Sequence, residues 1–218
     1  MKVVVIGATG ATGRELVECL VGDQRISEVI AFVRNSSLAE HPKLKQVIVN
    51  FDRLEEYSSL IVGHAAISCL GTTLKDAGNK QKQFMIDHGI PLKFAEIAYK
   101  NGVKQFLLLS SMNANSESHI FYSRMKGMLE QSIRQLGFPS LLIFQPSLLI
   151  RPNTKRLGEK FAQLILKFLN QIGLAKNQAP LHVKDLAKAM GIALFHQLDV
   201  VKVFSLVEIK DLVARDAV

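Results

Sequence analysis

The sequence is poor in cysteine, and this scarcity limits how the chain can be stabilised. Only Cys19 and Cys69 occur among its 218 residues, and neither belongs to a CxxC pattern. A domain of this length buries well over half of its unfolded surface, so it needs no disulfide staples. We therefore expect two buried, unpaired thiols in a reducing compartment.

Long apolar runs are absent as well. No stretch approaches the roughly 20 apolar residues that a membrane-spanning helix needs. The first apolar run, at residues 3–6, ends at Gly7, which is too early for a secretory signal sequence. These absences predict a cytoplasmic protein without a membrane partner.

Positive charge is in excess, but it lacks the pattern of a nucleic-acid-binding surface. The net charge is +8, and the densest basic group consists of Arg151, Lys155, Arg156 and Lys160, without interleaved aromatic residues. Charge alone indicates solubility and nonspecific attraction, so we interpret this group as solvated surface and expect no nucleic-acid partner. The six histidines form no cluster with metal-ligand spacing, and no metal is expected.

Short β-branched runs alternate with helical patterns along the whole chain. Strands are expected at residues 2–7, 29–34, 45–50, 65–71, 104–111, 140–145 and 201–207, and helices at 13–22, 84–101, 117–136, 156–172 and 183–197. Pro91 lies inside the second helix, which predicts either a start near Ile90 or a kink.

Strands that are apolar on both faces and alternate with helices indicate a parallel sheet covered on both sides. We expect residues 1–218 to form a single doubly wound (Rossmann) α/β domain. Residues from about 146 to 200 contain less strand, and they are expected to add a small helical cap over the carboxyl ends of the strands.

The clearest chemical signal is the stretch GATGATG, which follows the first strand and opens the first helix. It comprises Gly7, Ala8, Thr9, Gly10, Ala11, Thr12 and Gly13. In this context Gly7 permits the tight turn, Gly10 lets the backbone approach a pyrophosphate, and Gly13 allows close helix–strand packing. Backbone N–H groups and the helix dipole would hold the phosphate charge. The alternative is a turn without a ligand.

The end of the second strand indicates which nucleotide is bound. A site selective for NAD usually carries an acidic residue there, bonded to the ribose 2′-hydroxyl. This chain has Arg34, followed by Asn35-Ser36-Ser37, and no carboxylate. An arginine would pair with a 2′-phosphate through its planar donor fork, which favours NADP(H) as the cofactor. The alternative is an exposed surface arginine.

The stretch FYSRMKG places Tyr122 and Lys126 one helical turn apart, after a strand that ends in Ser110-Ser111. Reduction of a carbonyl by hydride requires a proton donor at the developing alkoxide, and a phenol stabilised by a nearby ammonium can serve. An amphipathic helix that happens to carry both residues is the alternative.

The GxxGxxG spacing of the loop resembles the extended and atypical short-chain dehydrogenase/reductase superfamily. The stretches ISCLGTT (67–73), FLLLSS (106–111), FYSRMKG (121–127) and FQPSLLI (144–150) together resemble its Tat-interactive-protein-like oxidoreductases. The resemblance implies that Ser111 holds the substrate oxygen, Tyr122 donates the proton, and Lys126 supports the phenolate and bonds the nicotinamide ribose. It also implies cofactor contacts at Asp52 (adenine), at Leu70, Gly71 and Thr72 (nicotinamide side) and at Pro146.

The expected function is therefore NADPH-dependent reduction of a carbonyl in a small, apolar substrate. Leu148, Leu149, Phe161 and Phe168 could line its pocket, although core packing explains them equally well. The sequence has Gln145-Pro146-Ser147 where relatives often have Arg-Pro-Gly, and no asparagine matches the proton-relay residue of other members. An NADPH-binding sensor or protein-interaction module is thus the main alternative. A sugar-nucleotide epimerase or dehydratase ranks lower, because little chain follows strand six. The superfamily resemblance also implies frequent homodimers.

Overall fold

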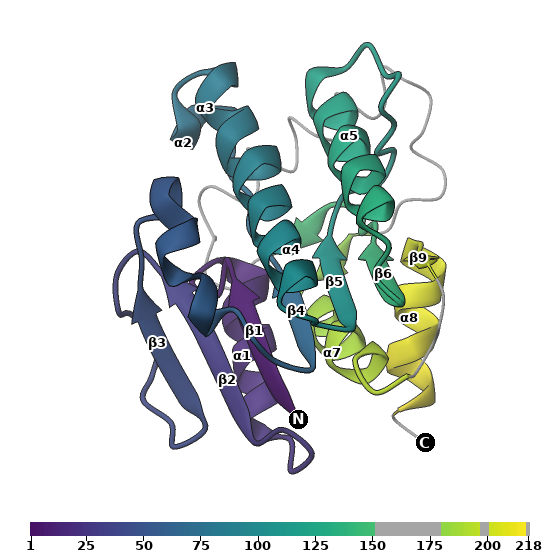
Figure 1. Cartoon of the computed structure of the whole chain (residues 1–218). Helices are drawn as coiled ribbons and strands as arrows, with labels where there is room; N and C mark the ends of the chain where they lie inside the picture. Colours follow the sequence, from purple (N-terminus) through teal and green to yellow (C-terminus); the bar gives the residue numbers. More distant parts are fainter. Residues whose placement is uncertain (151–179, 197–200, 217–218) are drawn as a thin grey trace.

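The computed structural model describes residues 1–150, 180–196 and 201–216 (Figure 1). Its centre is a seven-stranded sheet with the order β3-β2-β1-β4-β5-β6-β9, in which every neighbouring pair is parallel. The strands are β1 Lys2–Ile6, β2 Glu28–Val33, β3 Leu44–Ile48, β4 Ala65–Ser68, β5 Gln105–Leu109, β6 Ser140–Phe144 and β9 Val201–Phe204. A separate two-stranded sheet joins β7, Leu149–Ile150, to β8, Leu181–His182.

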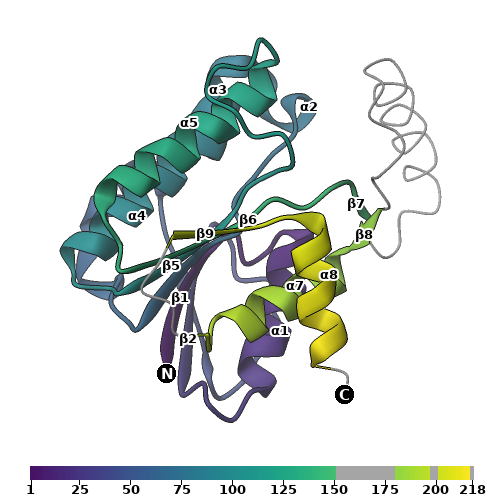
Figure 2. The ribbon, with the colours of Figure 1, turned by 90° about the vertical axis from the view of Figure 1, so that its right-hand side faces the viewer.

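Helices cover both faces of the sheet, so the molecule has three layers (Figure 2). The helices are α1 Ala11–Gly22, η1 Phe51–Leu60, α2 Leu74–Ala77, α3 Lys80–Phe84, η2 Met85–Gly89, α4 Ile90–Lys100, α5 Phe121–Leu136, α7 Val183–Ala193 and α8 Leu206–Arg215. In Figure 2, α4 and α5 lie on one side of the sheet, and α1, α7 and α8 lie on the other. The predicted doubly wound α/β fold is confirmed.

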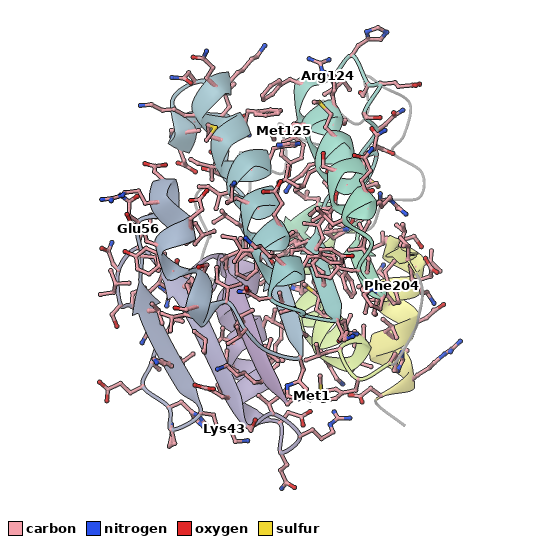
Figure 3. The ribbon with its side chains drawn as sticks, in the orientation of Figure 1. Met1, Lys43, Glu56, Arg124, Met125 and Phe204 are labelled. Carbon is pink, nitrogen blue, oxygen red and sulfur yellow. The ribbon has the colours of Figure 1, made fainter. Side chains whose placement is uncertain are left out.

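The two hydrophobic cores follow from the alternation of side chains along each strand. Val3 and Val5 of β1 belong to the core beneath α1, α7 and α8, whereas Val4 and Ile6 belong to the core beneath α4 and α5. At the far end of the sheet, the Phe204 ring of β9, labelled in Figure 3, stacks on Phe144 of β6 with 4.7 Å between the centroids. The strands are apolar at successive positions because both faces of the sheet are buried under helices.

The C-terminal strand is shorter than predicted, and the helix after it was not predicted. β9 ends at Phe204, whereas the expected strand ran to residue 207. Ser205 and Glu208 form a capping box: the Ser205 N–H donates to Glu208 Oε2 at 2.9 Å, and the Ser205 side chain accepts from the Glu208 N–H. Such reciprocal bonds start a helix, so Leu206 and Val207 belong to α8.

Other boundaries also differ. α1 begins at Ala11, two residues early, and α5 begins at Phe121, because residues 117–120 form turns instead of a first helical turn. Both cysteines are unpaired as expected, but only Cys69 is buried; Cys19 is half-buried on α1.

The helix predicted at 84–101 corresponds to the C-terminal part of a longer helical rod. α3, η2 and α4 run continuously from Lys80 to Lys100, and η2 is a π-helical turn. α4 begins at Ile90 with Pro91 in its first turn, so the predicted start near Ile90 is confirmed. Gly102, at φ +79°, follows the end of the helix in a conformation that favours glycine.

The cap predicted over residues 146–200 stays a prediction. The expected helix at 156–172, Phe161, Phe168 and the basic group at 151–160 lie outside the described residues. Of the remainder, α7 contacts α1 on one face of the sheet. None of the described helices is long and apolar enough to cross a membrane.

Candidate functional site

The predicted site residues gather at the carboxyl edge of the sheet. The strand order reverses between β1 and β4, because β2 and β3 extend the sheet on one side of β1 and the later strands extend it on the other. Open α/β sheets bind ligands at such a switch point. The glycine loop follows β1 and the segment from Cys69 to Thr73 follows β4, so the topology places them next to each other.

The glycine loop is shaped by close backbone approaches. Gly7 has φ +75°, and a Cβ there would lie 2.4 Å from the backbone of Cys69 and Leu70. A Cβ on Gly13 would lie 2.1 Å from the carbonyl oxygen of Gly7. Both positions therefore require glycine for the packing of the loop against β4 and of α1 against β1. Within the loop, Ala8 and Thr12 are also buried.

The start of α1 suits an anion. Gly10, its N-cap, is exposed, makes no side-chain capping bond, and no acidic residue lies in the first turn. Thr9 and Ala11 on either side are partly exposed. A helix N-terminus with this geometry directs unsatisfied N–H groups and the positive end of the helix dipole toward solvent. The residues thus fit the pyrophosphate of a dinucleotide.

Two arginines lie beside the loop that follows β2. Arg34 is exposed directly after the strand. Arg14, on α1, donates from Nε to the Thr9 carbonyl at 3.0 Å and from its two terminal nitrogens to the Ser37 carbonyl and hydroxyl at 2.9 and 3.1 Å. Arg14 therefore ties the glycine loop to the loop containing Arg34. Sequence reasoning missed it, although its place directly after Gly13 was a signal.

Asp52 lies at the start of η1 on the wall of a cleft of about 790 Å³. The other walls come from α3, η2, α4 and Phe121 of α5 and include the apolar residues Phe84, Met85, Ile86 and Ile90. This volume is within the usual range for small-molecule pockets. The predicted adenine contact thus borders a site of suitable size.

The segment after β4 is held by the α3–η2 rod. The Thr72 N–H donates to Asp87 Oδ1 at 2.7 Å, and Gln83 Nε2 donates to the Thr72 carbonyl at 3.2 Å. Gly71, which precedes Thr72, is exposed, and Leu70 is partly buried. Asp87 was not identified from the sequence, because its partner is 15 residues away.

The ends of β5 and β6 are tied together. The Ser110 hydroxyl donates to the carboxylate of Glu130 on α5, which also accepts from Gln145 Nε2 at 2.9 and 3.1 Å. The Met112 N–H donates to the carbonyl of buried Pro146 at 3.0 Å. Among the described residues, the buried Oγ of Ser111 has no hydrogen-bond partner. The structure thus gives Ser110 a structural bond and leaves the hydroxyl of Ser111 available.

α5 places Lys126 at the same edge. Figure 3 labels Arg124 and Met125, which precede it; Met125 is buried, and Arg124 donates to the Ser118 carbonyl at 2.8 Å. Lys126 is only 2% exposed, and its Nζ donates a long bond of 3.5 Å to the Leu109 carbonyl at the end of β5. Tyr122, one turn earlier, is 41% exposed. The structure therefore brings Lys126 to the strand end, while the phenol stays at the surface.

The Lys126 charge acts on three buried groups around it. Burial raises the pKa of Asp87 to about 6, and Lys126 opposes that rise. Burial lowers the pKa of His88, and Lys126 lowers it further. Burial raises the pKa of the Cys69 thiol to about 12, so this cysteine is an inert core residue despite its place beside the glycine loop. Within the described ranges, no group of acidic, histidine and cysteine residues could hold a metal ion.

Comparisons with known proteins agree with this geometry. Residues 7–136 match the family model described as NAD(P)H-binding. Protein HTATIP2 of Rattus norvegicus is 34% identical over 68% of this chain, which spans 63% of that relative's length. Protein FMP52 of Candida albicans, named mitochondrial, is 29% identical over 86% of this chain and 85% of its own. The solved oxidoreductase ylbE of Lactococcus lactis superposes with a TM-score of 0.73 at 21% identity, over 99% of this chain and 96% of its own, which shows the shared fold.

The prediction of a cytoplasmic location is contradicted by these relatives. The Candida albicans protein and further fungal relatives are named as mitochondrial. The prediction failed because unpaired cysteines and the lack of a spanning segment are properties that proteins of several compartments share. The family assignment itself rests on the glycine loop, the strand order and the match over residues 7–136. The chain belongs to the NAD(P)H-binding family.

Proposed function

We propose that this protein is an NADPH-dependent oxidoreductase of the short-chain dehydrogenase/reductase type, which reduces a carbonyl group of a small, apolar substrate. One observation carries the proposal: Lys126 of α5, one helical turn after Tyr122, is buried with its Nζ at the end of β5. In the sheet, β5 lies two strands from β1, the strand that the glycine loop follows. Burying an ammonium is costly, so a surface role does not explain its position.

The residues that would hold NADPH lie along the carboxyl edge. The N–H groups of the first turn of α1 would bind the pyrophosphate, and Arg34 would pair with the 2′-phosphate. Asp52 would bond the adenine beside the apolar wall of the cleft, and Leu70, Gly71, Thr72 and Pro146 would border the nicotinamide. When bound, NADPH would supply the hydride.

Three side chains would handle the proton and the substrate oxygen. The Ser111 hydroxyl would donate a hydrogen bond to that oxygen as negative charge develops on it. The Tyr122 hydroxyl would transfer its proton to the oxygen, and the Lys126 ammonium would stabilise the phenolate that remains. Water would then return the proton to Tyr122.

The proposal is tested in two steps. Isothermal titration of NADPH and NADH first measures cofactor binding and preference. NADPH oxidation, monitored across a panel of apolar aldehydes and ketones, then measures turnover. The proposal predicts tighter binding of NADPH and consumption with at least one compound. Equal affinities would refute the cofactor preference.

A second function is favoured by the exposure of Tyr122. A phenol that is 41% exposed while its lysine is buried also fits an NADPH-binding sensor or interaction module without turnover. That protein would bind NADPH tightly and leave every carbonyl compound of the panel unreduced.

A further inference from the structure

The rod formed by α3, η2 and α4 contains an irregular turn that bonds the segment after β4. η2, Met85–Gly89, is π-helical, and Pro91 follows within two residues. Proline offers no N–H, and its ring collides with the carbonyl four residues earlier, which here belongs to Asp87. A wider turn avoids that collision, and π-helical turns often occur at functional sites. Asp87 and His88 are the buried residues of this turn.

Asp87 fixes the segment after β4 together with Gln83. They bind opposite sides of one residue: Asp87 Oδ1 accepts the Thr72 N–H at 2.7 Å, and Gln83 Nε2 donates to the Thr72 carbonyl at 3.2 Å. The preceding Gly71 has no atom within 4 Å of the place where a Cβ would stand. The shape of this segment therefore depends on the rod more than on its own packing.

Asp87 is also a carboxyl group that is fully buried. Its side chain is 0% exposed, and in the part of the chain that the structure describes its Oδ2 has no hydrogen-bond partner. A buried carboxylate of this kind costs free energy unless a positive group compensates it. Lys126 acts on it from α5, and His88, its neighbour in the same turn, is held toward the neutral form by burial. Asp87 is thus a fully buried carboxyl group that holds the segment containing Thr72.

We propose that Asp87 is a positioning residue for the nicotinamide end of the cofactor: its carboxylate holds the Thr72 backbone in place. The inference rests on the proposed function. It adds that the burial of Asp87, although unfavourable for stability, fixes the geometry of one end of the dinucleotide site. The other end, formed by the glycine loop and Arg34, does not depend on Asp87.

Two ligands test the two ends of the site separately. NADPH carries the nicotinamide, whereas 2′-phosphoadenosine 5′-diphosphoribose has the same adenosine, 2′-phosphate and pyrophosphate without it. We expect Asp87→Leu, which removes the acceptor and keeps the branched shape of the side chain, to weaken NADPH about tenfold in isothermal titration, with the fragment changed by less than about twofold. Asp87→Asn should recover NADPH to within about threefold of wild type, because the amide oxygen still accepts the Thr72 N–H.

Asp76→Asn is the matched control. Asp76 is exposed on α2 and bonds the Thr73 hydroxyl, next to Thr72, so both ligands should bind it as they bind the wild type. Gln83→Leu removes the other bond to Thr72 and should reproduce the selective loss; it decides the matter if Asp87→Leu does not fold. Equal weakening of both ligands, or unchanged NADPH binding in Gln83→Leu and Asp87→Leu, would overturn the inference while leaving the proposed function intact. A wild type that binds neither ligand would overturn both.

Discussion

The hydroxyl of Ser110 donates a hydrogen bond to the buried carboxylate of Glu130, whereas the neighbouring Ser111 hydroxyl has no partner among the described residues. Neighbouring residues at a strand end point to opposite faces, so these two serines cannot do the same work. Ser110 connects β5 to α5. Ser111 keeps the donor that a substrate oxygen would need.

This division predicts opposite phenotypes for two alanine variants. Ser111→Ala should lower turnover on an accepted substrate by roughly 10²-fold, because a transition-state donor is lost, with little change in the free energy of unfolding. Ser110→Ala should leave turnover near wild type and destabilise the fold by about 1–2 kcal/mol, because Glu130 loses a buried donor. Urea unfolding and steady-state kinetics on both variants measure the two effects. The reverse pattern would assign the substrate oxygen to Ser110.

Gln145 gives the carboxylate of Glu130 a neutral partner. The Gln145 amide donates to both carboxylate oxygens, so the buried charge of Glu130 is bonded by neutral groups in the described structure. Gln145→Leu should destabilise the fold by about 1–3 kcal/mol, because these bonds are lost. Gln145→Arg should be at least as stable as the wild type, since a guanidinium pairs with a carboxylate through two bonds. Chemical denaturation ranks the three proteins, and a leucine variant as stable as the wild type would argue against a structural role of the pair.

Arg34 and Arg14 lead to different expectations for the cofactor. Arg34 is exposed, while the guanidinium of Arg14 bonds to Thr9 and Ser37. Arg34→Glu should therefore weaken NADPH by about tenfold or more and leave NADH unchanged or improved, because repulsion of the 2′-phosphate replaces a charge-assisted bond. Arg14→Ala should weaken both cofactors, since it loosens the loops on either side. Isothermal titration of both cofactors with both variants distinguishes the roles; equal loss of NADPH and NADH in Arg34→Glu would contradict the assignment.

The stability of the protein should depend on pH through Asp87. Burial raises its folded pKa to about 6, above the ordinary value of 3.8. Between these values the folded carboxyl holds its proton while the unfolded one has lost it, so this group's contribution to stability falls as pH rises from about 4 to 6. Asp87→Asn stays neutral and should be more stable than the wild type by about 3 kcal/mol at pH 7.5, with little difference near pH 4. Comparing urea unfolding of the wild type and Asp87→Asn at each pH cancels the titration of the groups that lie far from residue 87. A variant less stable than the wild type at pH 7.5 would contradict the burial cost.

The sequence predicted those features that local patterns specify. The spacing of the glycines and the alternation of apolar runs with helical patterns predicted the fold and the tight turn between β1 and α1, because a turn and a buried strand each depend on a few neighbouring residues. The capping box at Ser205 and Glu208 was an equally local signal that was overlooked. Asp87 and Glu130 could not be identified in this way. Their roles come from contacts with Thr72 and Ser110, which only the packed helices bring within reach.

The exposed phenol of Tyr122 provides the sharpest test of catalysis. Tyr122→Phe removes the hydroxyl and keeps the ring, and the side chain is exposed enough that the fold should not change. A general acid contributes roughly 10²–10⁴-fold, so turnover should fall by about that factor while NADPH affinity stays near wild type. Lys126→Ala should reduce both turnover and NADPH binding, because the ammonium would support the phenolate and contact the cofactor. Tyr99→Phe is a suitable control, since that tyrosine is similarly exposed on α4 and packs against Phe138. Single-turnover kinetics with saturating NADPH compares the four proteins; full turnover in Tyr122→Phe would make FYSRMKG an ordinary helix face and favour the binding module.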